Sequence, residues 1–186
     1  TAYRRQRQMC IRDRCIIGMV VFCLILLSVL KIADIHRDGI IIRDGIYNVC
    51  TVEAAGPNLV VWDVEWGQAV IGANVHLWEA SYGSPQKFHL KNIGNNIMGI
   101  FYGDDGMCVA VSEDGTKLEL QVYEDKENQK WIFERQGNSQ YFNIKNCEDG
   151  LYVKYARSDE ETYFGLKMEK LSDDNAFKFM LRKQGV

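Results

Sequence analysis

The residues Gln86-Lys87-Phe88 form an amide-x-aromatic triplet that returns twice along the chain, as Gln129-Lys130-Trp131 and as Asn175-Ala176-Phe177. The three triplets are separated by 43 and 46 residues. A near-constant period of this length is typical of one supersecondary unit that is repeated and stacked against its own copies. The sequence therefore predicts three units, which we place at residues 44–95, 96–138 and 139–185.

The segment before each triplet alternates between apolar and polar residues, which is the pattern of a strand with one buried face. The apolar positions are Val75 and Leu77 in the first unit, Leu118, Leu120 and Val122 in the second, and Phe164, Leu166 and Met168 in the third. Earlier strands are predicted around Trp62-Asp63-Val64, Val109-Ala110-Val111 and Val153-Lys154-Tyr155, after the turn residues Gly56-Pro57-Asn58, Asp105-Gly106 and Asp149-Gly150. With the strands expected at 45–52, 97–102 and 140–145, each unit has about four strands.

About twelve strands in three equal sets, with no helical period, predict an all-β fold: a closed antiparallel barrel with threefold pseudosymmetry. The triplets, the pairs Leu77-Trp78 and Val122-Tyr123, and the run Asp149-Gly150-Leu151-Tyr152-Val153 together resemble the ricin B-type lectin repeat. The resemblance covers residues 44–185. It implies the β-trefoil fold and, since trefoils also serve as inhibitors and protein binders, it implies sugar binding less directly.

The resemblance also implies where sugars would bind. Members of the family use an Asp on the second strand, a Gln or Asn on the third strand with an aromatic two residues later, and an Asn beside the triplet Gln. The first unit keeps Asp63 and Trp78, and has His76 and Pro85 at the other two positions. We therefore expect the main site at Asp63, His76 and Trp78, with Asn74 on the same strand face.

The second unit keeps Gln121, Tyr123 and Asn128 but has Ala110 in place of the Asp, so it predicts a weaker second site. The third unit has Lys154, Lys167, Glu169 and Asp174 at the four positions and keeps none of the set. The alternatives in the first unit are an Asx-type turn at Asp63, a Trp78 ring that only covers the barrel mouth, and a His76 that is an ordinary surface residue. Five triplet residues are expected to be structural: Gln86, Phe88, Gln129, Trp131 and Phe177.

Catalytic and cofactor chemistry finds no support in the sequence. The carboxylate pairs Asp104-Asp105, Glu160-Glu161 and Asp173-Asp174 fall in polar, turn-like stretches, where adjacent side chains point apart. The three histidines are scattered, there is no CxxC spacing or phosphate loop, and the net charge is -3. We therefore predict no enzyme activity, no metal, no cofactor and no nucleic-acid partner. Cys50, Cys108 and Cys147 are expected to be small buried residues without a disulfide framework.

The N-terminal part matches nothing in the repeats. Residues 1–14 resemble the translation of a sequencing adapter and are set aside as an artefact. Residues 15–32 are a hydrophobic segment that fits a helix serving as a secretory signal or membrane anchor; no A-x-A-like cleavage site follows, which favours the anchor. With a linker at 33–43, we expect a monomeric barrel outside the cytoplasmic membrane, secreted or anchored to its outer face.

Three functional hypotheses remain open at this stage. The favoured one is an exported lectin-like module that binds a glycan or polysaccharide through the first repeat. The alternatives are a trefoil that binds protein, as an inhibitor or toxin-like adhesin subunit, and the lectin module of a truncated larger hydrolase.

Overall fold

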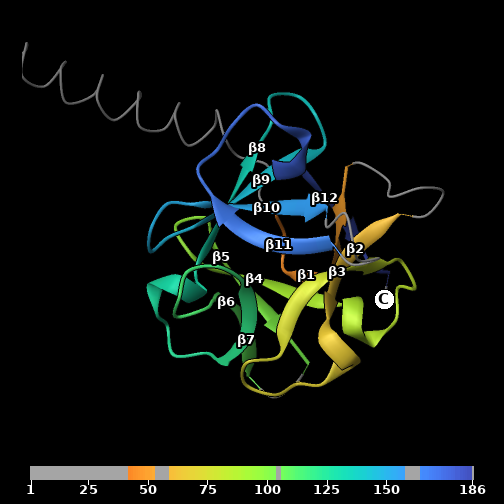
Figure 1. The fold of residues 1–186 in the computed structure, drawn as a ribbon, viewed down its shortest axis with the longest axis vertical. Coiled ribbons are helices and arrows are strands. Elements are labelled where there is room, and N and C mark those ends of the chain that lie inside the picture. Colours follow the sequence, from red (N-terminus) through yellow and green to blue (C-terminus); the bar gives the residue numbers. More distant parts are fainter. Residues whose placement is uncertain (1–41, 53–58, 104–105, 158–163, 186) are drawn as a thin grey trace, which may run out of the picture. The chain divides into compact units, whose positions relative to one another are not determined.

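The computed structural model describes residues 42–52, 59–103, 106–157 and 164–185. The adapter-like segment, the hydrophobic segment 15–32 and most of the linker lie outside these residues, so the expected N-terminal helix remains a prediction. Twelve strands are present in the described part, and the helical elements there are four single 3-10 turns (Figure 1). No helix in this part has the length and apolarity needed to cross a membrane.

Each unit contains four strands, as the repeats predicted, and a 3-10 turn precedes the last strand of each unit. The first unit consists of β1 (Gly45–Thr51), β2 (Val60–Val64), η1 (Glu65–Gly67), β3 (Asn74–Glu79), η2 (Ser84–Gln86) and β4 (Phe88–Gly94). The second consists of β5 (Ile97–Tyr102), β6 (Met107–Val111), β7 (Leu118–Val122), η3 (Glu127–Gln129) and β8 (Trp131–Arg135). The third consists of β9 (Tyr141–Asn146), β10 (Tyr152–Arg157), β11 (Phe164–Glu169), η4 (Asn175–Phe177) and β12 (Phe179–Lys183).

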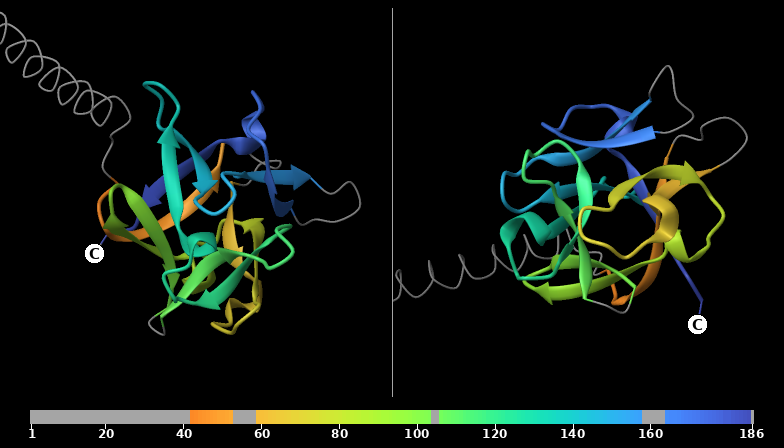
Figure 2. Two further views of the ribbon diagram at one scale, coloured as in Figure 1. Left: turned by 90° about the vertical axis from the view of Figure 1, so that its left-hand side faces the viewer. Right: turned by 60° about the horizontal axis from the view of Figure 1, so that its bottom comes forward.

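The first and last strands of the units close a barrel of six strands. In this ring β1 pairs with β4, β4 with β5, β5 with β8, β8 with β9, β9 with β12 and β12 with β1, all antiparallel. Closure leaves no open sheet edge in the ring. The middle strands form the hairpins β2–β3, β6–β7 and β10–β11, and β3 pairs with both β7 and β11 (Figure 2). This arrangement is a β-trefoil, which confirms the predicted fold.

The barrel core is built from equivalent residues of the three units. Phe88, Trp131 and Phe179 are the first residues of β4, β8 and β12, and all three are fully buried. The rings of Phe88 and Phe179 pack edge-on against Trp62, with centroids 6.1 and 5.7 Å from its ring. Truncation of an aromatic residue in such a position typically costs about 3–5 kcal/mol. The repeated aromatic residue therefore specifies the fold.

One of the three triplets is placed two residues later than the sequence suggested. In the first two units the triplet Gln ends the 3-10 turn and the aromatic begins the next strand; in the third unit Phe177 and Phe179 hold these places. The equivalent triplet is therefore Phe177-Lys178-Phe179, and Asn175-Ala176 precedes it. Phe177 is buried, as expected, but it occupies the position of Gln86 and Gln129.

Candidate functional site

The first unit brings Asp63 and His76 together on neighbouring strands. Asp63 on β2 lies opposite His76 on β3, and one carboxylate oxygen, Oδ1, is 3.6 Å from His76 Nε2. Only 9% of Asp63 is exposed to solvent. Because Asp63 lies inside a strand, the alternative of an Asx-type turn is excluded.

The buried amide of Gln86 orients this carboxylate. Gln86 Nε2 donates hydrogen bonds to Asp63 Oδ2 at 2.9 Å and to the carbonyl oxygen of Glu79 at 2.9 Å. Gln86 Oε1 accepts from the backbone N–H groups of Ser81 and Tyr82 at 2.8 and 2.7 Å. The amide is thus fixed from both ends, and it holds one oxygen of Asp63 while the other faces His76. The structural role expected for Gln86 is confirmed.

Trp78 supplies an exposed ring beside this pair. It lies two residues after His76 on the same face of β3, with 38% of its surface exposed. The two rings are stacked, with centroids 6.0 Å apart and an interplanar angle of 24°. Asn74 begins β3 on this face and lies opposite Glu119 of β7. The structure therefore groups Asp63, His76 and Trp78, whereas Asn74 lies at the junction with the second unit.

The η1 turn that follows β2 borders the same place, and no motif in the sequence points to its residues. The carbonyl oxygen of Gly67 accepts a hydrogen bond from the Tyr102 hydroxyl at 3.0 Å. Burial and, to a smaller extent, the negative charge of Asp63 raise the pKa of Tyr102. Gly67 also lies against Pro85, so that a Cβ added to it would be 2.9 Å from Pro85 Cγ. Pro85 therefore supports this turn.

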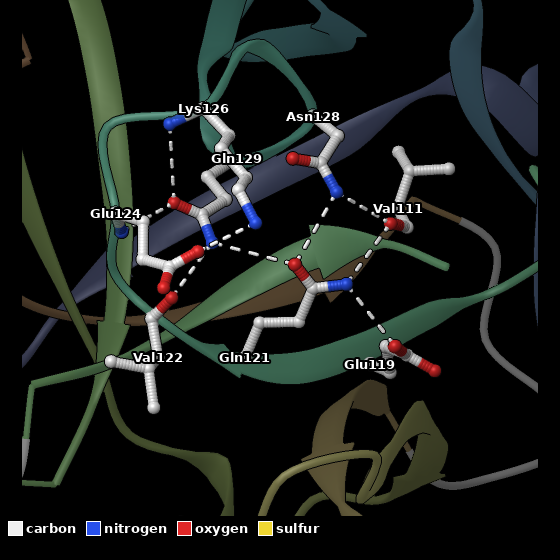
Figure 3. A network of polar contacts seen from close by, with 8 residues as sticks. All are labelled: Val111, Glu119, Gln121, Val122, Glu124, Lys126, Asn128 and Gln129. Carbon is white, nitrogen blue, oxygen red and sulfur yellow. Dashed lines mark hydrogen bonds and ion pairs between the residues drawn. The ribbon is translucent and has the colours of Figure 1, made fainter. Parts of the chain in front are cut away.

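In the second unit, polar side chains occupy the corresponding place (Figure 3). Gln121 Oε1 accepts from Asn128 Nδ2 at 3.3 Å and from Gln129 Nε2 at 3.4 Å. Gln121 Nε2 donates to Glu119 Oε1 at 3.1 Å, and Asn128 Nδ2 also donates to the carbonyl oxygen of Val111 at 3.0 Å. Gln121 Oε1 thus accepts from Gln129 as Asp63 Oδ2 accepts from Gln86 in the first unit. Both polar atoms of the Gln121 side chain are engaged by side chains of the same unit.

The strand register explains this difference. Ala110 lies opposite Glu119, and Cys108 lies opposite Gln121. By pairing, Glu119 is therefore the counterpart of His76, and Gln121 is the counterpart of Trp78. The sequence comparison had equated Gln121 with His76 because it did not account for the tight turn at 112–117. In that turn Asp114 Oδ1 accepts from Ser112 Oγ at 2.6 Å and from Thr116 Oγ1 at 2.7 Å.

Tyr123 does not join this network. Its hydroxyl donates to Asp125 Oδ1 at 3.0 Å, and its ring packs edge-on against Phe101 at a centroid distance of 5.0 Å. Of the three residues predicted for a second site, the structure brings Gln121 and Asn128 together and places the Tyr123 side chain elsewhere. Their role in sugar binding stays a prediction.

In the third unit, Lys154 occupies the position of Asp63. Lys154 Nζ lies 3.0 Å from Glu169 Oε2, 3.9 Å from Asp174 Oδ2 and 5.4 Å from the centroid of the Phe177 ring. The acceptor of the first unit is thus replaced by a cation that is paired with carboxylates. The described residues contain no group of His, Cys, Asp or Glu side chains suited to a metal ion, and the thiols of Cys50, Cys108 and Cys147 are free.

Comparisons with known proteins connect this geometry to a fold shared with lectins. No protein-family model matches the chain, and no curated protein sequence does. Among solved structures, the designed threefold-symmetric protein ThreeFoil has a TM-score of 0.65 and 19% identity, and the match covers 76% of this chain and all of ThreeFoil.

Two natural proteins show the same likeness. The Polyporus squamosus lectin, solved with the epitope Neu5Aca2-6Galb1-4GlcNAc, has a TM-score of 0.59 and 14% identity over 76% of this chain and 49% of the lectin. An exo-beta-1,3-galactanase from Clostridium thermocellum has a TM-score of 0.64 and 17% identity over 75% of this chain and 30% of the enzyme. The chain thus spans about half of the lectin and under a third of the galactanase. It has the β-trefoil fold.

Proposed function

We propose that this protein is a lectin-like module that binds a glycan through its first unit and has no catalytic activity. The observation that carries the proposal is the Asp63 carboxylate, held by the buried Gln86 amide and placed beside the exposed ring of Trp78. A carboxylate in this position is fixed before a ligand arrives, so binding does not have to order it.

The chemistry of the group suits a pyranose ring. A carboxylate accepts hydrogen bonds from two neighbouring hydroxyl groups, and charge-assisted hydrogen bonds of this kind are stronger than neutral ones. The Trp78 ring offers an apolar face to the C–H side of the sugar. His76, 3.6 Å from Asp63, has ring nitrogens that donate or accept a hydrogen bond to a third hydroxyl group.

The comparisons support a binding role through the known structures of this fold. The Polyporus squamosus protein is a lectin that was solved with a bound glycan. The galactanase match spans only 30% of that chain, which favours a second candidate: a sugar-binding module within a longer hydrolase. Sequencing the gene past Val186 tests this candidate, because an adjoining hydrolase domain would be read directly. We also propose that residues 15–32 export or anchor the barrel, which fractionation of the producing cells would test.

The decisive experiment replaces the two main residues of the first unit. We expect Asp63→Asn and Trp78→Ala each to lower sugar affinity at least tenfold, about 1.4 kcal/mol. Asp63→Asn keeps an acceptor oxygen for Gln86 and so limits the effect on folding. The matched changes Lys154→Ala and Glu169→Ala in the third unit should leave affinity unchanged, and binding should be competed by free sugar on a glycan array. Four equal effects, or binding to a protein that free sugar does not compete, would overturn the proposal.

A further inference from the structure

The connection between β2 and β3 carries large apolar side chains that face solvent. Trp66 is 87% exposed, Val70 52% and Ile71 72%. Single exposed apolar residues are ordinary on protein surfaces, but a Trp side chain that packs against so little of its own protein is not. Trp66 adds almost nothing to the core, so its presence calls for another role.

The backbone at Trp66 is in an unfavourable conformation. Its φ of 60° and ψ of 5° lie in the left-handed region, which side chains other than Gly seldom adopt. Neighbouring contacts hold the turn in place, since the Tyr102 hydroxyl binds the carbonyl oxygen of Gly67 and Pro85 packs against Gly67. Strain that is kept by its surroundings at an exposed residue is a recurrent feature of binding sites.

The turn is next to the candidate sugar site. Trp66 follows Asp63 by three residues, and η1 contacts both η2, which carries Gln86, and β3, whose Val75 pairs with the Val64 that precedes η1. Tyr102 lies between the two places as well: its hydroxyl donates to the carbonyl oxygen of Gly67, and burial and, to a smaller extent, the charge of Asp63 raise its pKa. Trp66 on η1 and Trp78 on β3 therefore belong to two of the elements that adjoin the strand of Asp63.

The second unit lacks this combination. There Ala110 replaces the Asp, and the turn that follows β6, residues 112–117, contains no aromatic residue. Of these two units, the one that has the carboxylate, Asp63, also has the exposed Trp66.

We propose that Trp66 is a second sugar-stacking surface, so that the first unit binds an oligosaccharide of at least two sugar residues. The inference rests on the proposed function. One sugar residue binds Asp63 and stacks on Trp78, and the adjacent residue of the same glycan stacks on Trp66. A ring that is already exposed and held by a fixed turn loses little freedom on binding.

The test compares monosaccharides with longer glycans on the full chain. The probes are galactose, glucose, mannose and N-acetylglucosamine, each as a mono-, di- and trisaccharide, and binding is measured by array and then by titration calorimetry. We expect Trp66→Ala to bind the monosaccharide as the wild type does and to lose at least fivefold in affinity for the di- and trisaccharide. Trp66→Phe should keep most of the wild-type affinity for the di- and trisaccharide. The control Ile71→Ala, at an exposed position of the same loop, should change neither the monosaccharide affinity nor the oligosaccharide affinity.

The outcomes separate this inference from the proposed function. If the wild type binds sugar and Trp66→Ala leaves both affinities unchanged, or lowers them equally, Trp66 is not a second surface although the module is still a lectin. If the wild type binds none of the probes, both the proposed function and the proposed role of Trp66 are contradicted. Retention of the wild-type thermal midpoint by Trp66→Ala would show that a loss of affinity is not a loss of folding.

Discussion

At the scale of single residues, the three units differ in what the residue that ends the last 3-10 turn, two positions before the last barrel strand, can bind. Gln86 Nε2 donates to Asp63, whereas Gln129 Nε2 donates to Gln121 Oε1 and to the carbonyl oxygen of Val122. In the third unit Phe177 takes this place and has no amide to satisfy. The same structural amide therefore supports a carboxylate in the first unit and a closed set of side-chain hydrogen bonds in the second.

This difference predicts that Gln121→Ala affects folding and not binding. The change removes the acceptor for Gln129 Nε2 and Asn128 Nδ2, and loss of a hydrogen-bond partner in a buried place costs about 1–3 kcal/mol. We expect urea unfolding to show a loss of this size while sugar affinity stays at the wild-type value. Tyr123→Phe, which removes only an exposed hydroxyl contact, is the control. A loss of affinity in Gln121→Ala would show that the second unit binds sugar.

Asp114 gives a residue-scale prediction of pH dependence. Hydrogen bonds from the Ser112 and Thr116 hydroxyls and from the Thr116 backbone lower the pKa of Asp114 to about 2. Because the folded pKa is below the usual value near 4, the carboxylate stabilises the fold above pH 4 and this contribution is lost as pH falls toward 2. Asp114→Asn should therefore flatten the decline of the thermal midpoint between pH 4 and pH 2. The control is Glu113→Gln at the exposed neighbouring residue, which should keep the wild-type decline of the thermal midpoint. An equal decline in Asp114→Asn and the wild type would contradict the stabilising role of the Asp114 carboxylate.

At the scale of elements, the six-stranded ring explains why the units depend on one another. β1 of the first unit pairs with β12 of the third, and β8 of the second pairs with β9 of the third. A chain that ends at Asn138 lacks β9 to β12, so β1 and β8 lose partners and the ring cannot close. We expect this chain to lack a cooperative urea transition and to show disordered far-ultraviolet circular dichroism, in contrast to the chain of residues 44–185. A cooperatively folded fragment would contradict the account of the barrel.

The elements also show what the sequence could predict and what it could not. Alternation at Val75 and Leu77 and the repeated aromatics predicted the strands and the core, because burial leaves a periodic trace in sequence. The strand register could not be predicted in the same way. The tight turn after β6 makes Gln121 the counterpart of Trp78. In the third unit Phe177 replaces a Gln although the 3-10 turn is kept. Trp66 was missed because exposure and a left-handed backbone cannot be inferred from one Trp before a Gly.

At the scale of the whole molecule, the pseudosymmetry is kept in the core and lost at the positions equivalent to Asp63. Phe88, Trp131 and Phe179 are equivalent and fully buried, so each is needed to fill the barrel. The positions of Asp63, Ala110 and Lys154 are equivalent as well, but the fold does not require any one residue type there. Changes at these positions leave the barrel intact, which is compatible with the proposal that the first unit alone binds sugar.

The last prediction therefore concerns valency. Gln121 in the second unit is bound to Asn128 and Gln129, and Lys154 in the third is paired with Glu169 and Asp174. Among the residues that the structure describes at these three positions, only those of the first unit combine an oriented carboxylate with an exposed ring. Calorimetry of the chain with a monosaccharide should give a stoichiometry near one per chain and a Kd in the millimolar range, about -4 kcal/mol, because a small exposed contact must offset the ligand's lost freedom. Many copies on one surface should nevertheless adhere to a dense polysaccharide, since each later contact forms at high effective concentration. A stoichiometry near two would show that the second unit binds despite Ala110, and it would identify the hydrogen bonds of Gln121 as ones that a sugar can displace.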